Sequence, residues 1–113
     1  MMNKQRTFVV LVVCLSFLAV SCSRKVEKEY YPNGKLKSVL NYKKGQLEGI
    51  ALYYYENGNL KERVNYRKGK RERTGTTYYE SGKLKEEITY ENGEPVLVKL
   101  FDENGDLLSE TKP

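Results

Sequence analysis

The sequence is dominated by one segment that occurs three times and then a fourth time in shortened form. The copies are YYPNGKLKSVLNYKKG (30–45), YYYENGNLKERVNYRKG (53–69), YYESGKLKEEITYENG (78–93) and FDENGDLLSE (101–110). Matching glycines differ by 24, 24 and 23 positions: Gly34, Gly58, Gly82 and Gly105. A fixed period of ~20 to 50 residues is typical of an array in which each unit packs mainly on its neighbours.

The positions that survive the copying are apolar residues and glycines. The coinciding apolar positions include Leu36, Leu60, Leu84 and Leu107, and also Tyr42, Tyr66 and Tyr90. No repeated position carries a residue type that catalysis would need. The pattern indicates that the repeats retain the residues of a common fold and not those of a reactive site.

Turn signals fall about every dozen residues, and each contains a glycine at an expected structural turn: Gly34, Gly45, Gly58, Gly69, Gly82, Gly93 and Gly105. Asn-Gly between alternating apolar residues is a strong hairpin signal, because Asn tolerates a positive φ and Gly adopts it without steric cost. Between two turns, Leu60, Val64 and Tyr66 alternate with polar residues, which is the period of a strand. Strands joined by tight turns are antiparallel neighbours, so the simplest topology is a meander.

The predicted fold is therefore all-β: a single elongated antiparallel meander sheet of stacked hairpins, after a cleaved N-terminal signal helix. Arg73 stands where the preceding copy has Gly49, and this departure predicts a bulge in the third copy. The expected strands cover residues 26–31, 35–42, 47–55, 59–66, 71–79, 83–90, 95–101 and 106–111.

The large apolar groups of one unit do not offset the cost of ordering its residues. Hydrogen bonds and cross-strand tyrosine pairs reduce this deficit without removing it. We therefore expect the sheet to curl on itself, to dimerise or to cover a partner.

The first residues are typical of a secretory leader. Lys4 and Arg6 precede an apolar run over residues 8–20, which is too short to span a bilayer as a helix. The run ends in LAVSC (18–22), which resembles the lipobox of bacterial lipoproteins, where the cysteine is lipidated and becomes the first mature residue. Ala19 stands where that pattern usually has leucine, and an ordinary cleavage site would cut the same bond and leave Cys22 as a free thiol.

These observations predict a lipoprotein signal peptide over residues 1–21, lipidation at Cys22, a charged tether over 22–29 and a repeat domain over 30–113. Cys14 would be removed with the leader, so the mature chain could form no internal disulfide. The predicted location is the bacterial cell envelope with a lipid anchor, and the outer membrane is favoured over the inner one where a cell has two.

The pattern Y-Y-x-N-G-x-L-K followed by N-Y-x-x-G is similar to the MORN-repeat variant of bacterial proteins, a group that includes antitoxin-type proteins. The closest matches are YYENGNLK (54–61) and YYESGKLK (78–85), and the resemblance covers residues 30–110. It implies a long antiparallel sheet of stacked hairpins that binds proteins or membranes. It carries no catalytic residues to transfer.

Charge and residue types restrict the function further. The chain has 20 Lys and Arg against 15 Asp and Glu, interleaved along the repeats, which does not indicate a nucleic-acid stripe. Histidine is absent, and no serine has an identifiable base beside it. The segment 102–106 lacks the later ligands of a calcium loop and is explained as a copied turn. We expect no catalytic residue, no metal site and no cofactor.

Tyrosine provides the one candidate binding surface, because it offers a large rigid area with a polar tip. The candidate residues are Tyr53, Tyr54, Tyr55, Tyr78 and Tyr79. The alternative is that these tyrosines are cross-strand packing pairs.

The sequence predicts a non-enzymatic, lipid-anchored envelope repeat protein that acts as a protein-binding or scaffold module. Its partners would be the membrane, through Cys22, an unidentified protein, and another copy of itself if it forms a homo-oligomer. The alternative is an antitoxin or immunity protein that neutralises a cognate toxin.

Overall fold

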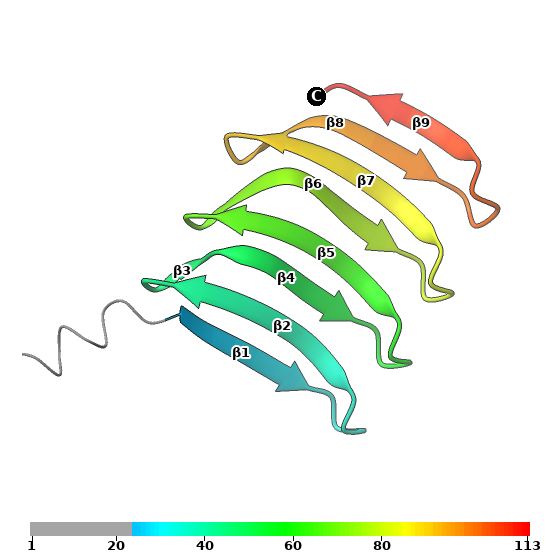
Figure 1. Ribbon diagram of the computed structural model, residues 1–113. Helices are drawn as coiled ribbons and strands as arrows, with labels where there is room; N and C mark the ends of the chain where they lie inside the picture. Colours follow the sequence, from blue (N-terminus) through cyan, green and yellow to red (C-terminus); the bar gives the residue numbers. More distant parts are fainter. Residues whose placement is uncertain (1–23) are drawn as a thin grey trace, which may run out of the picture.

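The chain forms one open antiparallel sheet in a computed structural model that describes residues 24–113 (Figure 1). The strand order is β1-β2-β4-β5-β6-β7-β8-β9, and the short β3 also pairs with β2. The strands are β1 Arg24–Tyr30, β2 Leu36–Lys43, β3 Gln46–Leu47, β4 Gly49–Tyr54, β5 Leu60–Arg67, β6 Lys70–Tyr78, β7 Leu84–Glu91, β8 Glu94–Phe101 and β9 Leu107–Thr111.

This architecture confirms the predicted all-β antiparallel meander. The expected signal helix and Cys22 lie outside the described residues. Within residues 24–113 no helix is long and apolar enough to cross a membrane.

One predicted strand is divided in the structure. The prediction of a continuous strand over 47–55 is wrong, because the chain forms β3 and β4 with a break at Glu48. Gly49, the first residue of β4, has a φ of 91°, so the backbone departs from the extended conformation where the chain enters this strand. The predicted bulge in the third copy is confirmed, since the register of β5 on β6 shifts between Arg63 and Asn65, opposite the segment that contains Arg73.

The expected tether over residues 22–29 differs from the structure. Residues 24–29 belong to β1, which pairs with β2 from Arg24 opposite Lys43 to Tyr30 opposite Leu36. A charged segment can take this role because its backbone completes the hydrogen bonds of β2 while its side chains stay mostly exposed.

The tight turns are of two kinds that alternate along the chain. At Lys44-Gly45, Lys68-Gly69 and Asn92-Gly93 both residues have positive φ, as a two-residue hairpin of type I′ requires. The turns at the opposite end of the strands are of the second kind, in which only the glycine has a positive φ. In one of them the Gly58 N–H donates a hydrogen bond of 3.0 Å to the Tyr55 carbonyl. All seven predicted turn glycines have φ between 76° and 92°.

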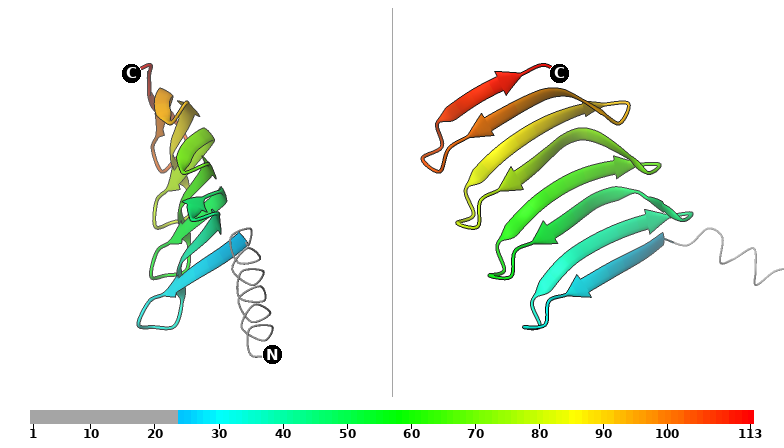
Figure 2. Two further views of the ribbon diagram at one scale, coloured as in Figure 1. Left: turned by 90° about the vertical axis from the view of Figure 1, so that its left-hand side faces the viewer. Right: turned by 180° about the vertical axis from the view of Figure 1, so that it is seen from behind.

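The sheet is a single layer, which is clear when it is viewed along its plane (Figure 2). Few side chains are buried in such a layer. Ala51 and Val64 face each other across β4 and β5 and are each 1% exposed, while Tyr90 and Ser38 are also buried. Most large side chains remain half-buried, so both faces of the sheet are available to a partner.

Candidate functional site

Strand alternation and register place five large side chains on one face of the sheet, which we call the tyrosine face: Tyr42, Tyr53, Tyr66, Arg71 and Tyr90. Side chains two apart share a face, and residues directly opposite in neighbouring strands share it as well. Ser38 lies opposite Tyr53, and Tyr66 lies opposite Arg71. The resulting row crosses five neighbouring strands: β2, β4, β5, β6 and β7.

Arg71 is the centre of this group. Its Nη1 donates a hydrogen bond of 2.9 Å to the Tyr90 hydroxyl, and its guanidinium carbon lies 5.6 Å from the centroid of the Tyr90 ring. Its Nη2 is 3.8 Å from Oε1 of Glu62. A hydrogen bond to Tyr66 is the main reason that the Arg71 pKa is raised above its ordinary value. The face therefore carries a fixed cation between two tyrosine rings.

Tyr53 and Tyr90 occupy partly desolvated positions on this face. Burial raises the pKa of Tyr53, with smaller effects from Tyr66 and Glu62. Tyr90 is 7% exposed and packs over Gly75, where an added Cβ would come within 3.2 Å of the Tyr90 ring. The glycine in β6 thus makes room for the Tyr90 ring.

The structure does not gather the five predicted tyrosines on one surface. Tyr53 lies on the tyrosine face, whereas the adjacent Tyr54 points to the opposite face. The Tyr55 hydroxyl donates to the Tyr78 carbonyl at 2.7 Å, and the Tyr79 hydroxyl donates to the Phe101 carbonyl at 2.8 Å. The Tyr78 hydroxyl accepts a bond of 3.1 Å from Thr76 Oγ1.

Sequence reasoning did not select four members of the tyrosine face: Tyr42, Tyr66, Arg71 and Tyr90. The three tyrosines recur in the repeat at matching positions, which is a signal that could have identified them. Arg71 has no such signal, because the matching positions hold Leu47 and Pro95. Its role depends on the register between β5, β6 and β7.

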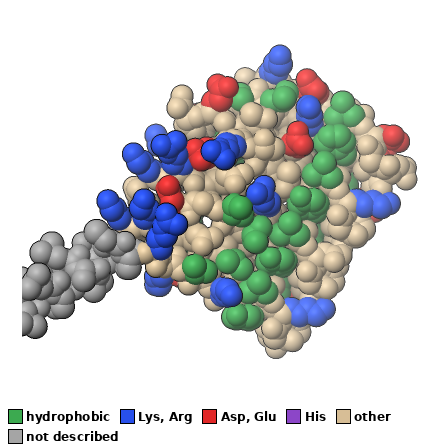
Figure 3. All heavy atoms as spheres, viewed as in Figure 1, with side chains coloured by type: hydrophobic (Ala, Val, Ile, Leu, Met, Phe, Trp, Pro, Cys, Tyr) green, Lys and Arg blue, Asp and Glu red, His purple; other side chains and the backbone are tan. Residues whose placement is uncertain are grey.

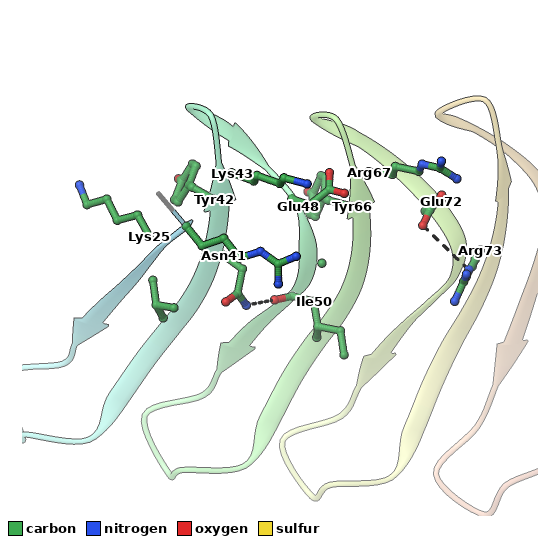
Figure 4. A pocket seen from close by; sticks show the side chains of 13 residues that line it. Lys25, Asn41, Tyr42, Lys43, Glu48, Ile50, Tyr66, Arg67, Glu72 and Arg73 are labelled. Carbon is green, nitrogen blue, oxygen red and sulfur yellow. Dashed lines mark hydrogen bonds and ion pairs between the residues drawn. The ribbon is translucent and has the colours of Figure 1, made fainter. Parts of the chain in front are cut away.

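An open depression lies beside the tyrosine face, where the pairing between β2 and β4 is interrupted (Figure 4). Its lining is rich in cations, and the Asn41 amide donates to the Ile50 carbonyl at 2.6 Å across it. The positively charged lining residues are Arg24, Lys25, Lys43, Arg67 and Arg73, and the acidic ones are Glu48 and Glu72. The depression therefore favours anionic groups on any partner that extends over it.

The face shown in Figure 3 carries a band of hydrophobic side chains that crosses the strands. Lys and Arg side chains gather at the side of the molecule where β1 begins. In residues 24–113 no group of three or more His, Cys, Asp or Glu side chains could hold a metal ion. The arrangement offers large surfaces for contact and no assembled reactive group among the described residues.

Stacked hairpins of one period, tied side by side in an open sheet, define a β-repeat array. The chain belongs to the family described as MORN repeat variant, whose model matches residues 25–44, 47–68 and 74–92, more than half of the sequence. Repeats of this family are generally protein-binding or membrane-binding modules and are typically not enzymes. Neither a curated protein nor a solved structure shows a significant match to the chain.

Proposed function

We propose that this chain is a non-enzymatic, lipid-anchored protein of the bacterial cell envelope, and that its tyrosine face binds another protein. The observation that carries the proposal is the single layer of the sheet. It leaves Tyr42, Tyr53 and Tyr66 half-buried on a face that no other part of residues 24–113 covers.

The composition of this face matches that of protein interfaces. Tyrosine and arginine are enriched at the energetically dominant positions of such interfaces, because they combine a large contact area with directional hydrogen bonds. Arg71 is already oriented by Tyr90 and Glu62, so a partner would lose little side-chain entropy in engaging it. The fitting partner presents apolar side chains to the tyrosines and a carboxylate to Arg71.

The proposed anchor is a lipid on Cys22. The motif that ends at Cys22 supports it. A chain fixed at Cys22 would hold the sheet close to the membrane surface. Mass spectrometry of the mature N-terminus tests this part, and an unmodified Cys22 would disprove the anchor without affecting the tyrosine face.

The binding proposal is tested by capture from detergent-solubilised membranes with the full chain. Tyr53→Ala should lose a stoichiometric protein partner, while Leu52→Ala should retain it. The two residues are neighbours in β4, both are half-buried, and their side chains point to opposite faces. Equal capture by both variants, or no stoichiometric partner at all, would reject the tyrosine face as the binding surface.

The identity of a captured partner also tests the antitoxin or immunity function. An envelope-acting toxin as the partner, together with growth arrest when this gene alone is deleted, would assign the chain to that function. Normal growth of the deletion strain would reject it and leave the binding role unchanged.

A further inference from the structure

The two edges of the sheet differ in a way that points to self-association. β1 has five charged residues among seven, and charged edge strands discourage pairing with other chains. β9 has one charge, Glu110, and two exposed leucines, with Leu107 at 53% and Leu108 at 63% exposure. The exposed leucines on the edge strand β9 therefore need an explanation.

Leu108 replaces a lysine that every earlier copy keeps. The matching residues, Lys37, Lys61 and Lys85, place their Nζ atoms 5.8, 5.6 and 5.6 Å from the ring centroids of Tyr31, Tyr55 and Tyr79. In the fourth copy Leu108 stands for the lysine and Asp102 for the tyrosine. A lysine would protect an exposed edge best at this point, and the chain has a leucine there instead.

Asp102 also lacks the hydroxyl that links each earlier unit to the next. In earlier copies the tyrosine at this place donates its hydroxyl to the next unit, as Tyr79 does to the Phe101 carbonyl. The Asp102 Oδ1 instead accepts bonds of 2.9 Å from the backbone of Asn104 and Asp106 in its own turn. A further repeat placed on β9, such as β1 of another copy, would lack the bond that ties all other units together.

The backbone of β9 is nevertheless suited to pairing on its outer side. Residues that match Ser109 in the earlier copies each pair with the following strand: Ser38 with Tyr53, Glu62 with Thr77 and Glu86 with Leu100. Each of these pairs follows a register shift like the one in β9 between Leu107 and Ser109. Pairing on the outer side begins at these residues, directly after the bulge, so β9 offers its outer side from Ser109 onward.

We propose that β9 pairs with β9 of a second copy, antiparallel and about a twofold axis at Ser109. A twofold axis requires a strand that is complementary to itself. This register places Leu108 opposite Glu110 of the second copy and keeps the two Glu110 carboxylates apart. The axis is perpendicular to the sheet, so both tyrosine faces lie on the same side of one continuous sheet.

The pairing goes beyond the proposed protein-binding role and does not depend on it. It gives the assembly two identical faces on one side, which raises the avidity for a partner that has two matching sites. It also places the exposed leucines of each copy beside side chains of the other.

The test measures the mass of the full chain in detergent by light scattering over a range of concentrations. The wild-type mass should rise from one copy to two, and Leu108→Lys should weaken this association by at least about tenfold. Leu108→Lys restores the residue of the three earlier copies, so the fold should tolerate it. Val26→Lys, at a similarly exposed position on β1, is the matched control and should not change the association.

A second measurement uses oxidative cross-linking in a chain with Cys14→Ser and Cys22→Ser. Ser109→Cys should form a covalent dimer, whereas Val26→Cys should not. A wild-type chain that stays monomeric at all concentrations, or equal cross-linking from both positions, would overturn the proposal. Because this background lacks Cys22, the result is independent of the lipid anchor.

Discussion

The hydroxyl of Tyr55 donates a hydrogen bond of 2.7 Å to the carbonyl of Tyr78, which lies 23 residues further along the chain. The same bond joins Tyr31 to the Tyr54 carbonyl at 2.6 Å and Tyr79 to the Phe101 carbonyl at 2.8 Å. Each repeat is thus linked to the next at the end of the strands that carries the turns of Gly34, Gly58, Gly82 and Gly105. In a layer with so few buried side chains, these bonds help to fix how neighbouring hairpins are aligned.

We predict that Tyr55→Phe lowers the free energy of unfolding by ~1 kcal/mol, because it removes one hydrogen bond and leaves the Tyr78 carbonyl without that donor. Urea unfolding followed by circular dichroism measures the change. Tyr30→Phe is the control, since Tyr30 is 60% exposed and its loss of a hydroxyl should matter little. Equal midpoints for the two variants would contradict the proposed role of the bond.

A second link between repeats is missing from the third copy and can be restored. The side-chain amide of Asn33 donates to the Glu56 carbonyl at 3.1 Å, and that of Asn57 donates to the Glu80 carbonyl at 3.0 Å. Ser81 holds the matching place and is too short to reach the next turn. Ser81→Asn should therefore stabilise the sheet by ~0.5 to 1 kcal/mol in urea unfolding, through a bond to the Glu103 carbonyl.

The reverse change provides the control for this prediction. Asn33→Ser should lose a similar amount of stability, because it creates the Ser-Gly-Lys turn that the third copy already has and removes the amide bond to the Glu56 carbonyl. If both substitutions shift the midpoint in the same direction, the amide bridge does not stabilise the array.

The strands and turns could be predicted from the sequence because their signals are local. Glycine is required wherever φ is positive, and an alternation of two residues identifies a strand without knowledge of its neighbours. The role of asparagine was only partly predicted. Asn92 has a positive φ, as expected, but Asn57 is not among the residues that do, and it serves to bridge two repeats.

The tyrosine face could not be predicted to the same extent, because it depends on which residues lie opposite each other. The bulges between paired strands shift the register and decide which tyrosines share a face. Arg71 joins Tyr66 to Tyr90 only after three strands are aligned. The division of β3 from β4 was also missed, since a glycine inside a strand pattern has several outcomes.

Arg73 lies in the left-handed region with a φ of 58°, where the matching residue of the earlier copy is glycine. A side chain there costs about 1 kcal/mol, and Arg73 gains little in return, since its side chain is 82% exposed and its contact with Glu72 is 3.9 Å long. Arg73→Gly should therefore raise the thermal midpoint. Arg71→Gly, two residues earlier in the same strand, should lower it, because it removes the bonds to Tyr90 and Glu62. A lower midpoint for Arg73→Gly would show that its backbone is not strained.

The raised pKa of Tyr53 predicts a loss of stability in alkaline solution. Its ordinary value is 10.0, and burial favours the protonated hydroxyl in the fold. The resulting stabilisation is fully present below pH ~10 and disappears as the pH rises through the higher pKa of the folded state. Tyr53→Phe cannot ionise, so its free energy of unfolding should fall less between pH ~8 and ~11 than that of the wild type. The measurement is urea unfolding at both pH values, with Tyr30→Phe as an exposed control. Parallel losses in the wild type and Tyr53→Phe would show that the Tyr53 hydroxyl is not desolvated by the sheet.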